Sequence, residues 1–151
     1  MKRVNEYQVL MEKQQEEFNK FPIKFAFNDK QFKESMNELG LTEKDTDKIV
    51  STGAGGFMRK TDFDEYVRLG NKFVKELEDA IENDKTGRGF VKDMFAYELA
   101  NHEYAYTRDL TDTLEVLGYT IEEINQNPKL LKGLKLALDE YSIEMEEEAE
   151  M

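Results

Sequence analysis

The sequence contains no cysteine. Disulfide bonds, thiolate metal sites and a cysteine nucleophile are therefore excluded, and the composition fits a reducing compartment such as the cytosol. Long apolar runs are missing too. None approaches the roughly 20 residues that a membrane span needs, and residues 1–18 interrupt their apolar positions with charge too often for a signal peptide. We therefore expect a cytoplasmic protein that is neither secreted nor inserted in a membrane.

Catalytic motifs are equally scarce. Serine occurs only at positions 35, 51 and 142, and none of these lies in a Gly-x-Ser-x-Gly elbow. The chain has 33 acidic residues, so close spacing of two carboxylates carries no information about acid–base chemistry. We therefore expect no enzyme activity, no catalytic residue and no cofactor.

The glycine-rich segment Thr52–Thr61 invites comparison with a phosphate-binding loop. A P-loop requires a glycine immediately before its Lys-Ser/Thr pair, but here Phe57–Arg59 separate the last glycine from the Lys-Thr pair. We interpret the segment as a structural turn, in which Gly53, Gly55 and Gly56 supply positive φ angles. The sequence thus predicts no nucleotide site in this segment.

Negative charge dominates the composition, with a net charge of −12. Residues 139–151 contain seven acidic residues and no lysine or arginine, which leaves −5 for residues 1–138. A weakly acidic body with no basic stripe is unsuited to phosphates, so we expect no direct binding of DNA or RNA. The first interpretation of an acidic composition is that it keeps the protein soluble, and the second is that it binds a basic protein partner.

The periodicity of the apolar residues predicts a mainly helical α+β domain with a small sheet of two or three strands near residues 21–60. The elements expected in the first part of the chain are a helix over residues 4–20, a strand over 21–27, a helix over 28–39, and strands over 48–52 and 56–60. Asn28 is a good N-cap for the second helix. The first strand is expected to place four apolar side chains on one half-buried face: Phe21, Ile23, Phe25 and Phe27.

Two long helices are expected next. Thr61 is suited to cap a helix whose apolar stripe runs from Phe63 to Ile81, and we interpret this as the central helix of the fold. A polar loop over residues 83–89 ends it. Residues 90–99 are then apolar on more than one side, which is typical of a buried helix.

Short helices with clear caps complete the chain. Their signals are Thr111 as a cap, Gly118 as a stop, the capping box of Thr120 and Glu123, and Pro128 in the first turn of the last helix. We expect one globular domain over residues 1–141 and an acidic, frayed tail over residues 142–151.

A candidate polar cluster surrounds the only histidine. It comprises Glu98, Asn101, His102, Glu103, Thr107 and Asp109. Glu98 and His102 are four residues apart, so their side chains share one face of a helix, and we interpret the cluster as hydrogen-bonded groups that fix the helix end. The alternative is a small metal-binding protein or enzyme centred on His102. A zinc site needs about four ligands, and with no second histidine and no cysteine we expect no metal.

Three motifs occur along the chain in a suggestive order: Phe21-Pro-x-x-Phe25-Ala-Phe27, Gly55-Gly-Phe-x-Arg-Lys60, and Tyr97-Glu-Leu-x-Asn-His-Glu-Tyr104. Together they resemble a family of small uncharacterised proteins encoded by phages and mobile elements of gut Firmicutes and related bacteria. The resemblance covers residues 6–119, and Ala54 interrupts the unbroken glycine run of the family. It implies no assigned activity, but it implies a setting, the cytosol of a bacterial host.

In that setting, a small acidic domain without catalytic motifs resembles phage accessory proteins that bind and block a host machine, including inhibitors of CRISPR nucleases. The resemblance implies a non-enzymatic interaction protein with a basic protein partner. Self-association through the apolar stripe of residues 4–18 is a third possibility, and the oligomeric state stays open. The candidate acidic partner surface consists of Glu76, Glu78, Asp79, Glu82, Asp84, Glu144, Glu146, Glu147 and Glu148.

Overall fold

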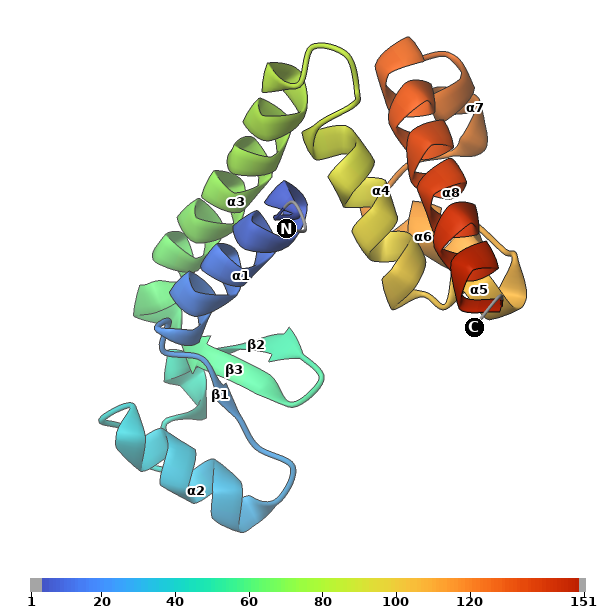
Figure 1. The fold of residues 1–151 in the computed structure, drawn as a ribbon. Coiled ribbons are helices and arrows are strands. Elements are labelled where there is room, and N and C mark those ends of the chain that lie inside the picture. The colour runs from blue at the N-terminus through green and yellow to red at the C-terminus, as the bar shows by residue number, and fades with distance from the viewer. Residues whose placement is uncertain (1–3, 150–151) are drawn as a thin grey trace. The chain divides into compact units, whose positions relative to one another are not determined.

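The computed structural model describes residues 4–149, and it describes the side chains of these residues except for 105–106 and 141–149. The elements in chain order are α1 Glu6–Asn19, β1 Lys24–Phe25, α2 Asp29–Glu38, η1 Thr46–Lys48, β2 Ile49–Gly53, β3 Gly56–Arg59, η2 Lys60–Asp62, α3 Phe63–Asn83, α4 Phe90–Asn101, α5 Tyr104–Thr107, α6 Thr111–Leu117, α7 Ile121–Asn125 and α8 Pro128–Ala149 (Figure 1). The prediction of a mainly helical α+β protein with a small sheet within residues 21–60 is thus confirmed.

The chain forms two compact units. The sheet unit comprises residues 14–75, and the helical unit comprises residues 1–13 together with 76–151. The division falls inside α1 and inside α3, so each of these helices contributes to both units.

The sheet unit is built on three antiparallel strands in the order β1-β3-β2. Phe57 of the middle strand β3 is buried, together with Met36 and Leu39 of α2, and the Phe32 ring lies 5.3 Å from the Phe57 ring. The helix α2 therefore packs on β3. Its predicted N-cap is confirmed, because the Asn28 side chain accepts a hydrogen bond from the Gln31 N–H at 2.8 Å.

The predicted strand over residues 21–27 is too long, because only Lys24 and Phe25 pair with β3. Pro22 has no N–H to donate, and the Ile23 N–H bonds back to the Phe21 carbonyl at 2.8 Å instead of to a neighbouring strand. The expected half-buried aromatic face also breaks up at its end, since Phe27 is 76% exposed.

The predicted hairpin of β2 and β3 is present, with a register shift between Ser51 and Gly53. The turn takes positive φ at three consecutive residues, Gly53, Ala54 and Gly55. Gly53 and Gly55 therefore supply positive φ as predicted, and Ala54 tolerates the left-handed region at a modest cost in energy. The prediction is wrong for Gly56, which is the first residue of β3 and has no positive φ; a Cβ atom on it would lie 3.1 Å from the Gly53 carbonyl oxygen.

The core of the helical unit surrounds α4. Five of its apolar side chains are buried: Phe90, Val91, Met94, Phe95 and Leu99. The buried core around them includes side chains from four other helices: Tyr7 of α1, Leu114 of α6, Ile124 of α7, and Leu130, Leu134 and Ala137 of α8. The prediction of a buried helix after the polar loop is confirmed.

The helix α3 is not the central helix that the stripe from Phe63 to Ile81 predicts. None of its residues, all of which the structure describes, is buried, and Val67 and Val74 are more than two-fifths exposed. Only its end, with Leu77 and Ile81, packs against the α4 core. The apolar stripe is long because the first part of α3 belongs to the sheet unit and its last part to the helical unit.

The predicted helix caps are present at some positions and displaced at others. The Thr120–Glu123 capping box is present, and Gly118 ends α6 in the left-handed conformation. Thr61 instead lies in the 3-10 turn η2, and α3 begins at Phe63. Thr111 is the first helical residue of α6 and not its cap, because its N–H donates to the Asp109 carboxylate at 2.9 Å.

Asp84 organises the loop between α3 and α4. Its carboxylate accepts hydrogen bonds of 2.9 to 3.3 Å from the backbone N–H groups of Thr86, Gly87, Gly89 and Val91. Burial raises the pKa of Asp84, but the four hydrogen bonds outweigh burial, and the pKa lies below its ordinary value. Because Val91 belongs to the first turn of α4, Asp84 caps this helix from the preceding loop.

The same loop lies close against α8 at two glycines. Gly87 has a φ of +90°, and a Cβ atom on it would lie 2.2 Å from the Lys129 carbonyl oxygen. A Cβ atom on Gly133 would lie 2.5 Å from Cγ1 of Val91. The Lys129 ammonium donates to the Ile81 carbonyl at 2.7 Å, which gives a carbonyl in the last turn of α3 a hydrogen-bond donor.

The last helix begins at Pro128, as predicted, and its backbone stays helical to Ala149. The side chains of the predicted acidic tail lie outside the described residues, so the domain boundary at residue 141 stays a prediction. No helix within residues 4–149 is both long enough and apolar enough to span a bilayer.

We expect Asp84→Ala to lower the free energy of unfolding by about 2 kcal/mol, because four backbone N–H groups lose their acceptor. Urea unfolding at neutral pH, followed by circular dichroism, measures the loss. Glu82→Ala is the matched control: Glu82 is exposed near the end of α3, and its truncation should change stability by less than about 0.5 kcal/mol. Equal effects of the two substitutions would contradict the capping role.

The contribution of Asp84 should also depend on pH. Since its pKa is lower in the folded protein than in the unfolded chain, the stabilisation is complete above the unfolded value of about 3.9. It is lost as the pH falls from there through the folded pKa. The difference in unfolding free energy between wild type and Asp84→Ala should therefore shrink in acid, and a pH-independent difference would contradict this account.

Candidate functional site

The predicted polar cluster is organised by Glu98, which is only 4% exposed on α4. One carboxylate oxygen accepts a hydrogen bond from the Tyr7 hydroxyl at 2.9 Å, and the other lies 3.2 Å from Nε2 of His102. The backbone carbonyl of Glu98 also accepts from the Thr113 hydroxyl at 3.4 Å. Both carboxylate oxygens therefore have partners from the protein itself.

Tyr7 is held as a neutral donor in this cluster. Burial, the hydrogen bond to Glu98 and the charge of Glu98 all raise the pKa of the Tyr7 phenol. Its ring packs edge-on against Phe90 at 5.9 Å and lies 5.5 Å from Tyr97. A phenol that keeps its proton and donates to a buried carboxylate stabilises the fold, and it is a poor candidate for a catalytic base.

The other predicted members of the cluster do not join this group. Asn101 is exposed on α4, and Glu103 is exposed in the left-handed conformation with a φ of 54°. The Thr107 hydroxyl accepts from the Asp109 N–H at 3.1 Å, and Asp109 in turn accepts from Thr111. The structure thus brings Glu98 and His102 together and uses Thr107 and Asp109 in the turn before α6.

Metal ligation requires several carboxylates or imidazoles around one point. Within the described residues, no three side chains of histidine, aspartate or glutamate are grouped so that they could hold a metal ion. The imidazole of His102 is 24% exposed and hydrogen-bonds Glu98, which is the geometry of a helix-end contact.

A second buried carboxylate, Asp93, was not among the residues predicted from the sequence. Its Oδ2 atom accepts from the Glu6 N–H at 2.9 Å, and its backbone carbonyl accepts from the Asn5 amide at 3.0 Å. The Asn5 side chain also accepts from the Gln8 N–H at 2.8 Å, as an N-cap does. The first turn of α1 is therefore fixed by α4, and an acid inside an apolar helix was the one available sign.

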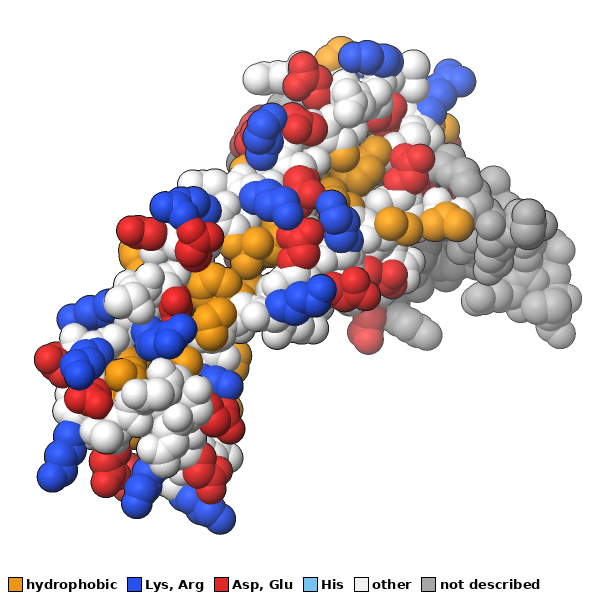
Figure 2. Space-filling view, turned by 90° about the vertical axis from the view of Figure 1, so that its left-hand side faces the viewer, with side chains coloured by type: hydrophobic (Ala, Val, Ile, Leu, Met, Phe, Trp, Pro, Cys, Tyr) orange, Lys and Arg blue, Asp and Glu red, His pale blue; other side chains and the backbone are white. Residues whose placement is uncertain are grey.

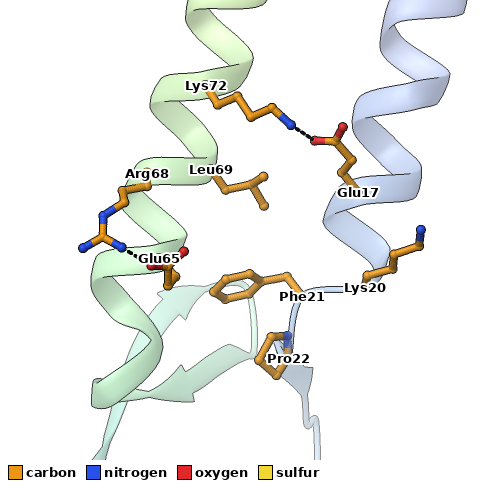
Figure 3. A pocket seen from close by; sticks show the side chains of 8 residues that line it. All are labelled: Glu17, Lys20, Phe21, Pro22, Glu65, Arg68, Leu69 and Lys72. Atoms are coloured by element: carbon orange, nitrogen blue, oxygen red, sulfur yellow. Dashed lines mark hydrogen bonds and ion pairs between the residues drawn. The ribbon is translucent and has the colours of Figure 1, made fainter.

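A shallow pocket of about 310 Å³ lies in the sheet unit, between the end of α1 and the first half of α3. Figure 3 shows Phe21, Pro22 and Leu69 in the pocket, with charged side chains around them. Lys72 pairs with Glu17 at 2.8 Å, and Arg68 pairs with Glu65. Two of its three cations are thus neutralised by neighbouring carboxylates, which makes the pocket unsuited to a phosphate group.

Charge is divided unequally between the two units. The sheet unit contains eleven acidic and eleven basic residues and is neutral, so the net charge of −12 belongs entirely to the helical unit. On the face shown in Figure 2, acidic and basic side chains are interspersed over the sheet unit. The sequence of the helical unit has three stretches of nearly pure negative charge: residues 76–84 with five acids and no base, residues 103–127 with six acids and one arginine, and residues 139–151 with seven acids and no base.

Members of the predicted acidic partner surface have different environments. Glu78, Asp79 and Glu82 are exposed on α3. Glu76 forms an ion pair with Lys13 at 3.0 Å, and the Asp84 carboxylate is occupied by the loop amides. The remaining four members, Glu144, Glu146, Glu147 and Glu148, have side chains outside the described part of the chain. The exposed carboxylates of α3 are therefore the described centre of this surface.

Residues 6–140 match a family of unknown function, DUF7659, and the chain belongs to this family. Comparisons with curated proteins and with solved structures found no significant match. The predicted resemblance to a family without assigned activity is confirmed at this level, and its phage setting stays a prediction.

We expect Tyr7→Phe to lower the free energy of unfolding by about 1 to 3 kcal/mol, because it leaves a buried oxygen of Glu98 without its donor. Tyr97→Phe is the matched control, since it removes a hydroxyl from a ring that touches Tyr7 without removing this hydrogen bond. Thermal and urea unfolding of both variants measure the difference. Equal losses would contradict the role of the Tyr7 hydroxyl.

Metal analysis tests the alternative centred on His102. We expect the purified protein to contain far less than one equivalent of zinc, manganese or iron, and His102→Gln to leave this content unchanged. The substitution should lower stability by about 1 kcal/mol, through the lost contact with Glu98. A stoichiometric metal that disappears in His102→Gln would instead establish a metal-binding protein.

Proposed function

We propose that this member of the DUF7659 family is a non-enzymatic interaction protein that binds a basic protein partner through its helical unit. The observation that carries the proposal is the confinement of the whole net charge of −12 to that unit, beside a neutral sheet unit. This segregation of charge makes the helical unit the negative pole of the chain. Such a pole steers a positively charged partner and sets its orientation.

The exposed carboxylates at the end of α3 form the centre of the proposed contact. Glu78 and Glu82 are four residues apart and share one face of the helix, and Asp79 lies beside them. Like charges at this spacing weaken a helix slightly. A lysine- or arginine-rich surface would relieve this repulsion on binding, so the arrangement supports a basic partner and disfavours nucleic acid.

A non-enzymatic role is supported by the state of the groups that could do chemistry. The Tyr7–Glu98–His102 contacts satisfy both oxygens of the buried carboxylate, and the pocket of Figure 3 has most of its charges paired. These groups hold helices in place. The function therefore belongs to the surface of the molecule.

The resemblance of the three sequence motifs to phage and mobile-element proteins narrows the partner further. In a bacterial cytosol, proteins with strongly basic surfaces are largely those that handle nucleic acids. We propose a host nucleic-acid or defence machine as the partner, with a CRISPR nuclease as one member of this class. An acidic protein can occupy the basic groove of such a machine in place of its substrate.

Binding to purified CRISPR effector nucleases and other host nucleic-acid enzymes tests the proposal. We expect at least one complex whose association rate falls steeply between roughly 0.05 and 0.5 M salt. The double substitution Glu78→Lys with Glu82→Lys should weaken it by about tenfold or more. Glu34→Lys with Glu43→Lys makes the same change of charge at exposed positions of the sheet unit and should have little effect. Binding that ignores salt and both substitutions would overturn the proposal.

A further inference from the structure

A groove lies between α6 and α7 in the helical unit, with a volume of about 580 Å³. Its apolar lining comes from Leu110, Leu114, Tyr119 and Ile121, and it is open to solvent. This volume lies in the range of ordinary ligand sites. Because the groove is open to solvent, it is better suited to part of a macromolecule than to a small ligand that must be enclosed.

The walls of the groove are fixed by local hydrogen bonds. The turn between α6 and α7 is closed by the Tyr119 N–H, which donates to the Leu114 carbonyl at 3.0 Å. The capping box of Thr120 and Glu123 then fixes the start of α7. The groove is thus formed by the backbone of the free protein and does not have to be created by a ligand.

Apolar side chains remain exposed here although the core lies directly beneath. Leu114 is buried in the core at 8% exposure, and Tyr119 packs against Phe95 with a ring distance of 6.5 Å. Ile121 by contrast is 43% exposed at the edge of the groove. Apolar side chains of a partner could therefore contact Leu114 on the floor of the groove and Ile121 at its edge.

The rim of the groove carries negative charge. Asp109 and Glu115 line it and are exposed. The pKa of Tyr119, which lines the groove, is raised mainly by burial and further by the negative charges of Glu123 and Glu78. These two carboxylates therefore add to the negative potential at the groove. Arg108 is the only basic residue between positions 103 and 127. An occupant must therefore be apolar at its centre and positive at its edges.

We propose that the α6–α7 groove docks a basic amphipathic helix of the partner, with apolar side chains on Leu110, Leu114 and Ile121 and with lysines or arginines facing the rim. The inference rests on the proposed function and names the binding element of the partner. An amphipathic helix presents apolar side chains at spacings of three and four residues with cations beside them, which matches an apolar floor with a negatively charged rim. A second copy of this chain would bring like charge to the groove.

A defined peptide serves as the probe. It is a fluorescein-labelled helix of leucine and lysine, with leucines at positions i, i+3, i+4 and i+7. We expect it to bind the full-length protein and to shift the NMR signals of residues 109–123 in particular. A peptide of the same pattern with glutamate in place of lysine, and one with serine in place of leucine, should each bind at least about tenfold more weakly by fluorescence anisotropy.

Matched variants locate the site. Ile121→Ser should weaken binding of the leucine–lysine peptide by about tenfold, because it removes an anchor contact. Val116→Ser changes another exposed side chain, 57% exposed on α6 and not part of the lining, and should alter affinity by less than about twofold. Circular dichroism of both variants verifies that they fold.

The outcomes separate this inference from the proposed function. Equal binding of the leucine–lysine and serine–lysine peptides, with signals shifting mainly in residues 76–84, would overturn the groove and leave the acidic pole in place. Equal binding of the leucine–glutamate peptide would overturn the basic occupant. Insensitivity to Ile121→Ser, together with loss on Glu78→Lys and Glu82→Lys, would also support the proposed function while overturning the groove.

Discussion

The helical unit depends on two carboxylates buried on one apolar helix. Asp93 and Glu98 lie on α4, where an unpaired charge would be costly, and both find their donors on α1: the Glu6 amide and the Tyr7 hydroxyl. The apolar residues of α4 form the core, and the hydrogen bonds of these two acids hold the beginning of α1 against it. The beginning of α1 is therefore positioned by directional bonds, whereas α6, α7 and α8 are positioned mainly by apolar packing.

This internal use of acids changes the meaning of the large negative charge. Asp84, Asp93 and Glu98 are engaged by backbone amides or by the Tyr7 hydroxyl, so they belong to the architecture. In the helical unit, the exposed acids include those on α3 and around α6 and α7. Since the sheet unit is neutral, the proposed recognition by charge belongs to the helical unit. In the proposed complex, the long-range field would act on approach and the apolar groove on docking.

The sequence predicted the features that a few neighbouring residues determine. The Asn28 cap, the Thr120 capping box and the contact of Glu98 with His102 all join residues at most four positions apart. Features that depend on distant residues could not be predicted from the sequence. Tyr7 and Glu98 are 91 positions apart, and periodicity does not show which donor will bond a buried acid. The apolar stripe of α3 was misleading for the same reason, because period alone does not tell whether one core or two units lie against a helix. The groove was equally hidden, since sequence cannot distinguish an exposed isoleucine at position 121 from a buried one.

The close approach of the 84–89 loop to α8 has a consequence for how this family can diverge. At Gly87 and Gly133 there is no space for even a methyl group, because the Lys129 carbonyl oxygen occupies it at Gly87 and Cγ1 of Val91 occupies it at Gly133. Relatives that share the fold should keep both glycines whatever they bind, so invariance there would record packing alone. Ile121 at the edge of the groove is 43% exposed and has no such packing constraint, whereas Leu114 on its floor is part of the core. Variation at position 121 among relatives, with the two glycines unchanged, would separate the residues that respond to a binding partner from those that maintain the fold.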